Sequence, residues 1–159
     1  AMIARGTRVI VAWFTMADRL PRVHLAISDN AGASFDEPRT HSPESALGRV
    51  QLAWTPGGFA LGWMEERNGN ARMRLAQYSP DGELQTDHIL ARVDRGRISG
   101  FPQIKVLDGQ LLVAWTAAAG DSRDTRRTRI RTGVMQLSKP AFADPADQIG
   151  ALDQEASGG

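Results

Sequence analysis

Three apolar segments that end in tryptophan recur along the chain about every fifty residues. Their sequences are VIVAW at residues 9–13, FALGW at 59–63 and LLVAW at 111–115. Short apolar runs rich in β-branched and aromatic residues are typical of buried strands, and self-similarity at this period indicates stacked supersecondary units. A chain of 159 residues is long enough for one such domain with its own core.

The segments that flank each tryptophan repeat as well. The runs RVQLAW (49–54) and FPQIKVL (101–107) precede the second and third tryptophan segments, and short glycine-containing turns join them as in hairpins. After each tryptophan a polar loop leads to an alternating run, RVHLAI (22–27), ARMRLAQY (71–78) or TRIRTGV (128–134). A weaker fourth run follows at 87–91, and another is expected near Arg39. The chain is therefore predicted to be all-β, built from antiparallel meanders of up to four strands.

These units cover residues of about 8–42, 49–91 and 100–138. Four-stranded meanders of about 40 to 50 residues in series are typical of β-propeller blades. The first unit lacks its first strand and the third lacks a clear fourth strand, so about two and a half blades are predicted, whereas closed propellers have at least about four. Residues 1–140 are therefore expected to form part of a propeller, and the polar tail 141–159 a linker or extended arm. Either a longer chain or association of copies would complete the ring.

The composition excludes several classes of site. With 19 basic and 18 acidic side chains the formal charge is +1, which gives no general attraction to nucleic acid or to an anionic membrane. There is no cysteine, and the histidines at 24, 41 and 88 show no ligand spacing, so neither a metal nor a cofactor is expected. The longest apolar runs are far shorter than the roughly 20 residues that span a bilayer. No signal peptide opens the sequence, although an export signal that has been removed stays an open alternative.

The stretch SDNAGASF, residues 28–35, lies between the third and fourth strands of the first unit. It resembles the Asp-box, the bacterial neuraminidase (BNR) repeat of sialidase-like β-propellers, whose pattern is Ser-x-Asp-x-Gly-x-Thr-Trp. Four positions fit the pattern, and Asn30 stands where the family has Asp; the fitting residues are Ser28, Gly32, Ser34 and Phe35. The segment SPDG at 79–82 looks like a decayed copy in the second unit, and with the repeats the resemblance covers most of residues 8–137.

This turn is expected to have a structural role. Asx and Ser side chains bond nearby backbone groups, Gly32 permits a left-handed conformation, and Phe35 is expected to tuck under the sheet as an anchor. The resemblance implies that the turn lies on the opposite face from the substrate. Function is therefore expected in the loops at the other end of the strands.

The resemblance also implies a chemistry for that other end. Sialidases hold a sugar carboxylate with three arginines and use a Tyr–Glu pair as nucleophile and an Asp as acid/base, which suits bidentate guanidinium binding and an oxocarbenium-like transition state. Arg49 and Arg97 stand at the starts of successive first strands, and Glu65, Glu66 and Asp94 are predicted on loops. The simpler alternative for each is a solvated surface charge. Trp54, at the end of a first strand, is a candidate for lining a central channel or stacking on a sugar, with core packing as its alternative.

Other features count against catalysis by this segment alone. The single tyrosine, Tyr78, falls at the turn end of its strand, and the family's Phe/Tyr-Arg-Ile-Pro motif is missing. Arginines crowd into residues 123–131, but they are interleaved with Asp121 and Asp124 rather than with aromatics, which favours a solvated face over a polyanion site. The repeated tryptophans Trp13, Trp63 and Trp115 are predicted to pack between units.

The sequence therefore leads to two hypotheses. In the first, the chain is a segment of a sialidase-like propeller that acts on or binds glycans, comes from an exported bacterial protein by resemblance, and lacks a complete glycosidase site. In the second, the propeller is a non-catalytic platform for protein partners. The expected partners are a carbohydrate and either a further copy or the remainder of a longer chain, and no membrane span is expected.

Overall fold

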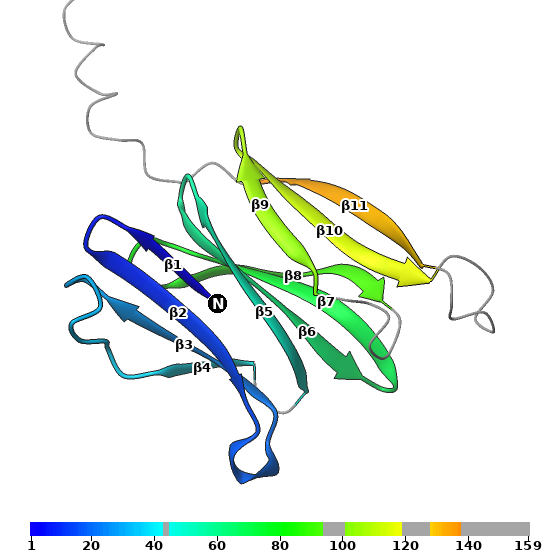
Figure 1. The fold of residues 1–159 in the computed structure, drawn as a ribbon, viewed down its shortest axis with the longest axis horizontal. Coiled ribbons are helices and arrows are strands. Elements are labelled where there is room, and N and C mark those ends of the chain that lie inside the picture. Colours follow the sequence, from blue (N-terminus) through cyan, green and yellow to red (C-terminus); the bar gives the residue numbers. More distant parts are fainter. Residues whose placement is uncertain (43–44, 94–100, 119–127, 138–159) are drawn as a thin grey trace, which may run out of the picture.

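The computed structural model describes residues 1–42, 45–93, 101–118 and 128–137. Within these ranges the chain forms three antiparallel sheets, one after another along the sequence, and a short 3-10 helix, η1 (Ala17–Arg19). The sheets lie side by side in Figure 1. The predicted all-β class and the antiparallel meanders are confirmed.

Sheet 1 has the order β1-β2-β3-β4, and each strand is bonded to the next along the chain. The strands are β1 (Met2–Arg5), β2 (Arg8–Thr15), β3 (Arg22–Ser28) and β4 (Arg39–Ser42). The strand expected near Arg39 is therefore present. The expectation that the first unit lacks its first strand is wrong, because β1 pairs with β2 from Met2 opposite Val11 to Arg5 opposite Arg8. β1 has only four residues, and so short a segment shows too little alternation of apolar and polar side chains to be recognised in the sequence.

Sheets 2 and 3 follow the same plan. Sheet 2 has the order β5-β6-β7-β8, and its strands are β5 (Ala46–Thr55), β6 (Gly58–Arg67), β7 (Asn70–Tyr78) and β8 (Leu84–Val93). Sheet 3 contains β9 (Gln103–Leu107), β10 (Gln110–Ala118) and β11 (Thr128–Gln136), with β10 in the middle. No fourth strand of sheet 3 falls in the ranges given above. The predicted tail, 141–159, lies outside the described residues.

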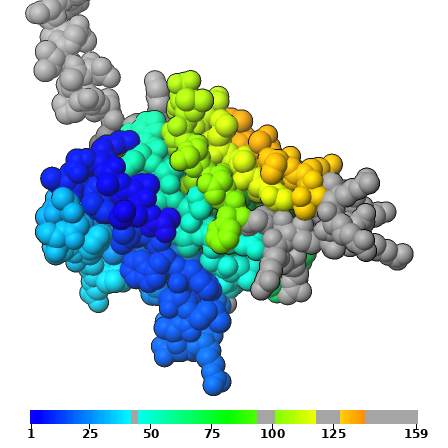
Figure 2. All heavy atoms as spheres, in the orientation of Figure 1, coloured from blue at the N-terminus to red at the C-terminus, as the bar shows by residue number. Residues whose placement is uncertain are grey.

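The first strands of the three sheets are neighbours in space, with β5 in contact with both β1 and β9. In Figure 2 the turquoise atoms of β5 are seen between the blue atoms of β1 and the yellow-green atoms of β9. We call β1, β5 and β9 the inner strands. Because connected strands alternate in direction, the turns after the inner strands share one edge of the molecule with the turns between third and fourth strands. We call this the turn edge, and the opposite edge, which carries the β2–β3 and β6–β7 connections, the loop edge (Figure 1).

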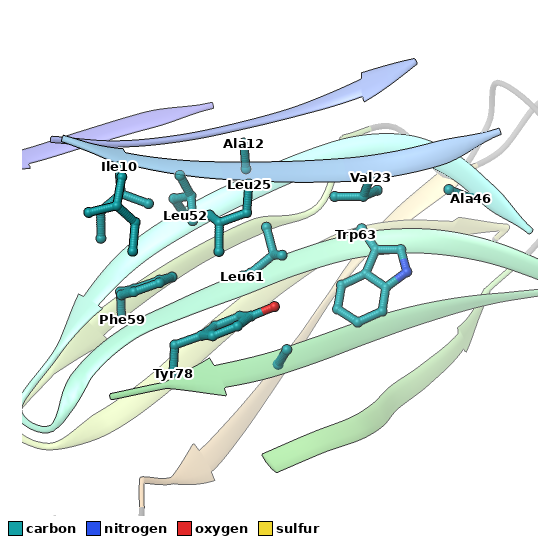
Figure 3. Close-up of a cluster of buried hydrophobic side chains, with 12 residues drawn as sticks. Ile10, Ala12, Val23, Leu25, Ala46, Leu52, Phe59, Leu61, Trp63 and Tyr78 are labelled. Atoms are coloured by element: carbon teal, nitrogen blue, oxygen red, sulfur yellow. The ribbon is translucent and has the colours of Figure 1, made fainter. Parts of the chain in front are cut away.

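Two apolar layers separate the sheets. The first lies between sheets 1 and 2 and contains Ile10, Val23 and Leu25 from one side and Phe59, Leu61 and Trp63 from the other (Figure 3). The second lies between sheets 2 and 3 and includes Met73, Leu75, Leu111 and Val113. Side chains alternate between the two faces of a strand, so each sheet has a front face toward the next sheet and a rear face toward the preceding one. The fold is therefore a stack in which sheet 2 is covered on both faces.

The three repeated tryptophans project from the rear faces of their sheets, with different outcomes. Trp63 is only 2% exposed because sheet 1 covers it, and Trp115 is partly buried against the second apolar layer. Trp13 lies on the side of β2 opposite Ile10 and Ala12, stays 37% exposed and stacks on His24. The prediction of packing between units is therefore confirmed for Trp63 and Trp115 and is wrong for Trp13 within the described part of the chain.

Candidate functional site

A hollow of about 480 Å³ follows the three inner strands. Its lining comes from Ile3 and Arg5 on β1, from residues 52–56 at the end of β5, and from residues 104–106 on β9. The residues of β5 are those nearest the β5–β6 turn, so the hollow lies toward the turn edge. The expectation that function belongs to the loops at the other edge stays a prediction, and the hollow is a second candidate place for it.

The chemistry of the hollow combines two cations with apolar walls. Arg5 and Lys105 are its charged lining residues, and none of the described residues that line it is a carboxylate. Positive side chains in a concave apolar surface raise the local concentration of anions. The hollow therefore favours an anionic ligand over a cationic one.

Trp54 lines this hollow and also connects β5 to β1 through a hydrogen bond. Its indole Nε1 donates a hydrogen bond to the carbonyl oxygen of Ala4, at 3.2 Å, and its ring meets Phe59 edge to face at 6.5 Å. The guanidinium carbon of Arg5 lies 4.7 Å from the ring centroid, in a cation–π contact. Trp54 therefore packs against the first apolar layer, as its packing alternative expected, and also lines the hollow. Its predicted place in a central channel or against a sugar stays a prediction.

Arg49 lies at the other end of β5, in an irregular part of the strand where the pairing with β6 shifts register. Its φ of +56° is unusual for a residue with a side chain, and Gly48 before it has φ +77°. The guanidinium contacts the sulfur of Met64 at 3.2 Å and lies 5.8 Å from the ring centre of Phe101. Burial lowers the pKa of Arg49, which nevertheless stays a cation at any physiological pH.

Arg49 and Trp54 do not form one site. They lie toward opposite ends of β5, and Arg49 is not among the residues that line the hollow. The two other predicted site residues near the loop edge, Asp94 and Arg97, lie outside the described residues, as do Arg123, Arg126 and Arg127 of the arginine-rich stretch.

Glu65 was predicted on a loop, and this is wrong, because β6 continues to Arg67 and leaves a tight turn of Asn68 and Gly69. Glu65 is only 6% exposed, and its Oε1 accepts a hydrogen bond from Nη1 of Arg74 at 3.0 Å. Asp87 on β8 binds the same guanidinium at 2.6 Å. Burial lowers the pKa of Arg74, but the hydrogen bonds and charges of Asp87 and Glu65 outweigh this and raise it overall. The carboxylate of Glu65 is therefore held by a structural ion pair.

A buried group of rings adjoins this ion cluster. His41 of β4 reaches across from sheet 1, meets Trp63 edge to face at 4.5 Å and shares a hydrogen bond between its Nδ1 and the hydroxyl of Tyr78. Burial lowers the pKa of His41 and raises that of Tyr78, so both side chains are neutral near pH 7. The hydroxyl of Tyr78 is therefore hydrogen-bonded to His41, and the carboxylate of Glu65 is paired with Arg74. Tyr78 and Glu65 do not form the nucleophilic pair of a sialidase.

The turn at 28–35 is built by its own side chains. The hydroxyl of Ser28 accepts a hydrogen bond from the amide of Gly32 and donates one to Oδ1 of Asn30, each at 2.9 Å. The same Oδ1 accepts from the amide of Ser34 at 2.9 Å, and Nδ2 of Asn30 donates to the Ser34 hydroxyl at 2.7 Å. The expectation that Phe35 tucks under the sheet as an anchor is wrong, because its side chain is 42% exposed and its ring lies over Gly32.

Asn30 should tolerate Asp and not Ala. Asn30→Asp keeps the oxygen that Ser28 and Ser34 share, and the Ser34 hydroxyl can then donate to the carboxylate, so we expect a change within about 0.5 kcal/mol. Asn30→Ala removes both oxygen and nitrogen and should lower the free energy of unfolding by about 1 to 2 kcal/mol. Urea denaturation of the three proteins measures this difference. Equal losses for both variants would contradict the hydrogen-bonding role.

The residues that sequence reasoning missed are those brought in by distant strands. Arg5 and Lys105 line the hollow only because β1 and β9 flank β5, and Arg74, Asp87 and His41 meet across two sheets. The one signal in the sequence was positional, since Arg74 and His24 occupy equivalent places opposite the repeated tryptophans. Among the residues that the structure describes, no group of three or more acidic or histidine side chains could hold a metal ion. Nor does any helix there have the length and apolarity to cross a bilayer.

Comparisons of the chain with models of protein families, with curated proteins and with solved structures found no match.

Proposed function

We propose that this chain is a segment of a sialidase-like β-propeller that binds glycans and does not itself contain a complete glycosidase site. Support for a propeller comes from the repeated meander, from the adjacency of the inner strands and from the self-bonded turn at 28–35. Repeated four-stranded meanders with adjacent inner strands are typical of a radial arrangement of blades.

The observation that carries the binding function is the hollow along the inner strands. It offers an indole edge, two cations and no described carboxylate in a space of about 480 Å³, which suits one or two sugar rings that bear a carboxylate or sulfate. Acidic saccharides are therefore the proposed ligand class. The burial of Glu65 in an ion pair and of Tyr78 against His41 supports binding without hydrolysis.

Lys105→Ala tests this function. Lys105 is exposed at the rim of the hollow, so its loss should leave the fold intact while removing a charge-assisted hydrogen bond of about 1.5 kcal/mol, or about a tenfold loss of affinity. Titration calorimetry with uronic-acid and sialylated oligosaccharides would measure it, and neutral oligosaccharides should bind more weakly. Arg92→Ala, which removes an exposed cation on β8 away from the hollow, is the matched control.

Two results would contradict this function. If Lys105→Ala and Arg92→Ala lowered the affinity equally, the hollow would not be the binding site. If no acidic saccharide bound, the proposed ligand class would be wrong. Turnover of a fluorogenic sialoside by the chain would contradict the absence of a complete catalytic site.

A platform for protein contacts is the second candidate, and one specific observation favours it. Large apolar side chains are exposed on both end sheets, among them Trp13 on sheet 1 and Ile130 and Val134 on sheet 3. Exposed apolar surface of this kind marks protein interaction sites.

A further inference from the structure

In the described part of the chain, no other sheet covers the rear face of sheet 1 or the front face of sheet 3. The rear face of sheet 1 exposes Trp13, although the smaller Val9 and Ala26 beside it are buried. The front face of sheet 3 carries Leu112, Ile130 and Val134, which are 39%, 69% and 61% exposed. In sheet 2 both faces are covered, and residues such as Phe59, Leu61 and Leu75 have no exposure. The two ends therefore expose the kinds of side chain that the middle of the stack buries.

Equivalent positions in the repeats show what fits each face. At the first junction Val23, on the front face of sheet 1, lies over Trp63 on the rear face of sheet 2 (Figure 3). At the second junction Met73, on the front of sheet 2, belongs to the same apolar layer as Trp115 on sheet 3. Val23 and Met73 occupy the same register position, because each pairs with the residue that follows the tryptophan of its own sheet.

A third pair completes the series, but its members lie at opposite ends of the chain. Ile130 pairs with Thr116, the residue after Trp115, and is therefore the equivalent of Val23 and Met73. Val23 and Met73 are 0% and 1% exposed, whereas Ile130 is 69% exposed. Trp13 is the equivalent of Trp63 and Trp115. Ile130 and Trp13 are thus the two halves of a junction that the chain makes twice within itself.

We propose that a second copy of this chain completes the junction, with the front face of sheet 3 of each copy packed on the rear face of sheet 1 of the other. Two copies related by a twofold axis then form both junctions at once and close a ring of six sheets, within the range of about four to eight blades of closed propellers. The proposal rests on the propeller arrangement proposed above, because only a radial stack curves back on itself. It continues an interface already present between sheets 1 and 2 and between sheets 2 and 3.

Closure also changes the hollow. In one copy the hollow is bounded by three inner strands and is open on the remaining side. In the ring the inner strands of the second copy face it across the central channel, so Arg5 and Lys105 of both copies surround the same space. A bound acidic saccharide would then contact cations from two chains.

The mass of the chain in solution tests the proposal. Light scattering coupled to size exclusion, across a range of concentration, should give twice the 17.3 kDa mass of one chain. Ile130→Lys and Trp13→Glu each place a charge in the junction and should each shift the mass to that of one chain. Both side chains are exposed in the single copy, so circular dichroism should show an unchanged fold.

The control is Leu84→Lys, which changes a leucine that is 53% exposed at the edge of sheet 2, away from both end faces, and should remain a dimer. Mixing Ile130→Lys with Trp13→Glu should restore the dimer, because the mixed pair keeps one unaltered junction and sets Lys against Glu in the other. A single-chain mass for the unaltered protein would overturn the proposal and assign the faces to other sheets. A mass above the dimer would also overturn it, since an open series of junctions gives a filament. So would a dimer that survives both substitutions.

The two proposals fail separately. If the chain is a monomer that still binds acidic saccharides through Lys105, the binding function stands and the ring of two copies is wrong. If it is a dimer that binds no saccharide, the ring stands and the proposed ligand class is wrong.

Discussion

Replacing Gly58 with alanine should lower the free energy of unfolding by more than about 3 kcal/mol or prevent folding altogether. A Cβ at this position would lie 2.1 Å from the carbonyl oxygen of Tyr78, 2.6 Å from the carbonyl carbon of Ser79 and 2.9 Å from the nitrogen of Pro80. All three are backbone atoms, so no side-chain rotation relieves the clash. The φ of +138° adds a conformation that only glycine adopts easily.

Gly109→Ala is the matched control for this prediction. Gly109 lies in the corresponding turn of sheet 3, has φ +73°, and has nothing within 4 Å of its would-be Cβ. Alanine there should lower stability by only about 1 kcal/mol, the effect of the backbone conformation alone. Thermal and urea unfolding of the two variants separate the steric effect from the conformational one. Similar losses would mean that the approach of the β5–β6 turn to Tyr78 is not tight.

Arg74→Met should destabilise the protein by about 3 kcal/mol. The substitution keeps much of the packing of the arginine stem but leaves the buried carboxylate of Glu65 and that of Asp87 without their cation. It also removes the guanidinium that lies 5.6 Å from the ring centre of Trp63. An uncompensated carboxylate in the junction between sheets 1 and 2 requires either desolvation or protonation, and both oppose folding.

Two further variants show whether the loss comes from the charge. Arg92→Met alters an exposed arginine on β8 and should change stability by less than about 0.5 kcal/mol. The double change Arg74→Met with Glu65→Leu removes the buried acid together with its partner and should recover a large part of the loss. A loss that is independent of Glu65 would point to packing alone.

The candidate site illustrates how local and distant information differ. Trp54 was a candidate because a tryptophan at the end of a first strand is unusual among the repeats, and the structure does place it in a hollow. Arg49 and Glu65 were chosen from their positions near strand ends, yet one lies in a strand irregularity and the other in an ion pair inside β6. Arg74, the partner of Glu65, lies on the next strand of the same hairpin, but Phe101, beside Arg49, comes from a segment whose approach no local pattern specifies. The cations of the hollow were missed for the same reason.

The sequence by itself determined the strands from residue 8 onward, their antiparallel order and the turn at 28–35. Alternation, the glycine-containing turns and the hydrogen-bonding side chains of that turn all act within about ten residues, so they are visible in the linear order. Only the tertiary structure decided that β1 joins sheet 1, that Trp63 is buried while Trp13 is exposed, and that the hollow lies toward the turn edge. β1 pairs with the next strand along the chain and was missed because its four residues show too little alternation. The other two features depend on which sheet covers which face. The contacts responsible for them join residues about fifty positions apart, and a repeat cannot indicate which of its copies will find a neighbour.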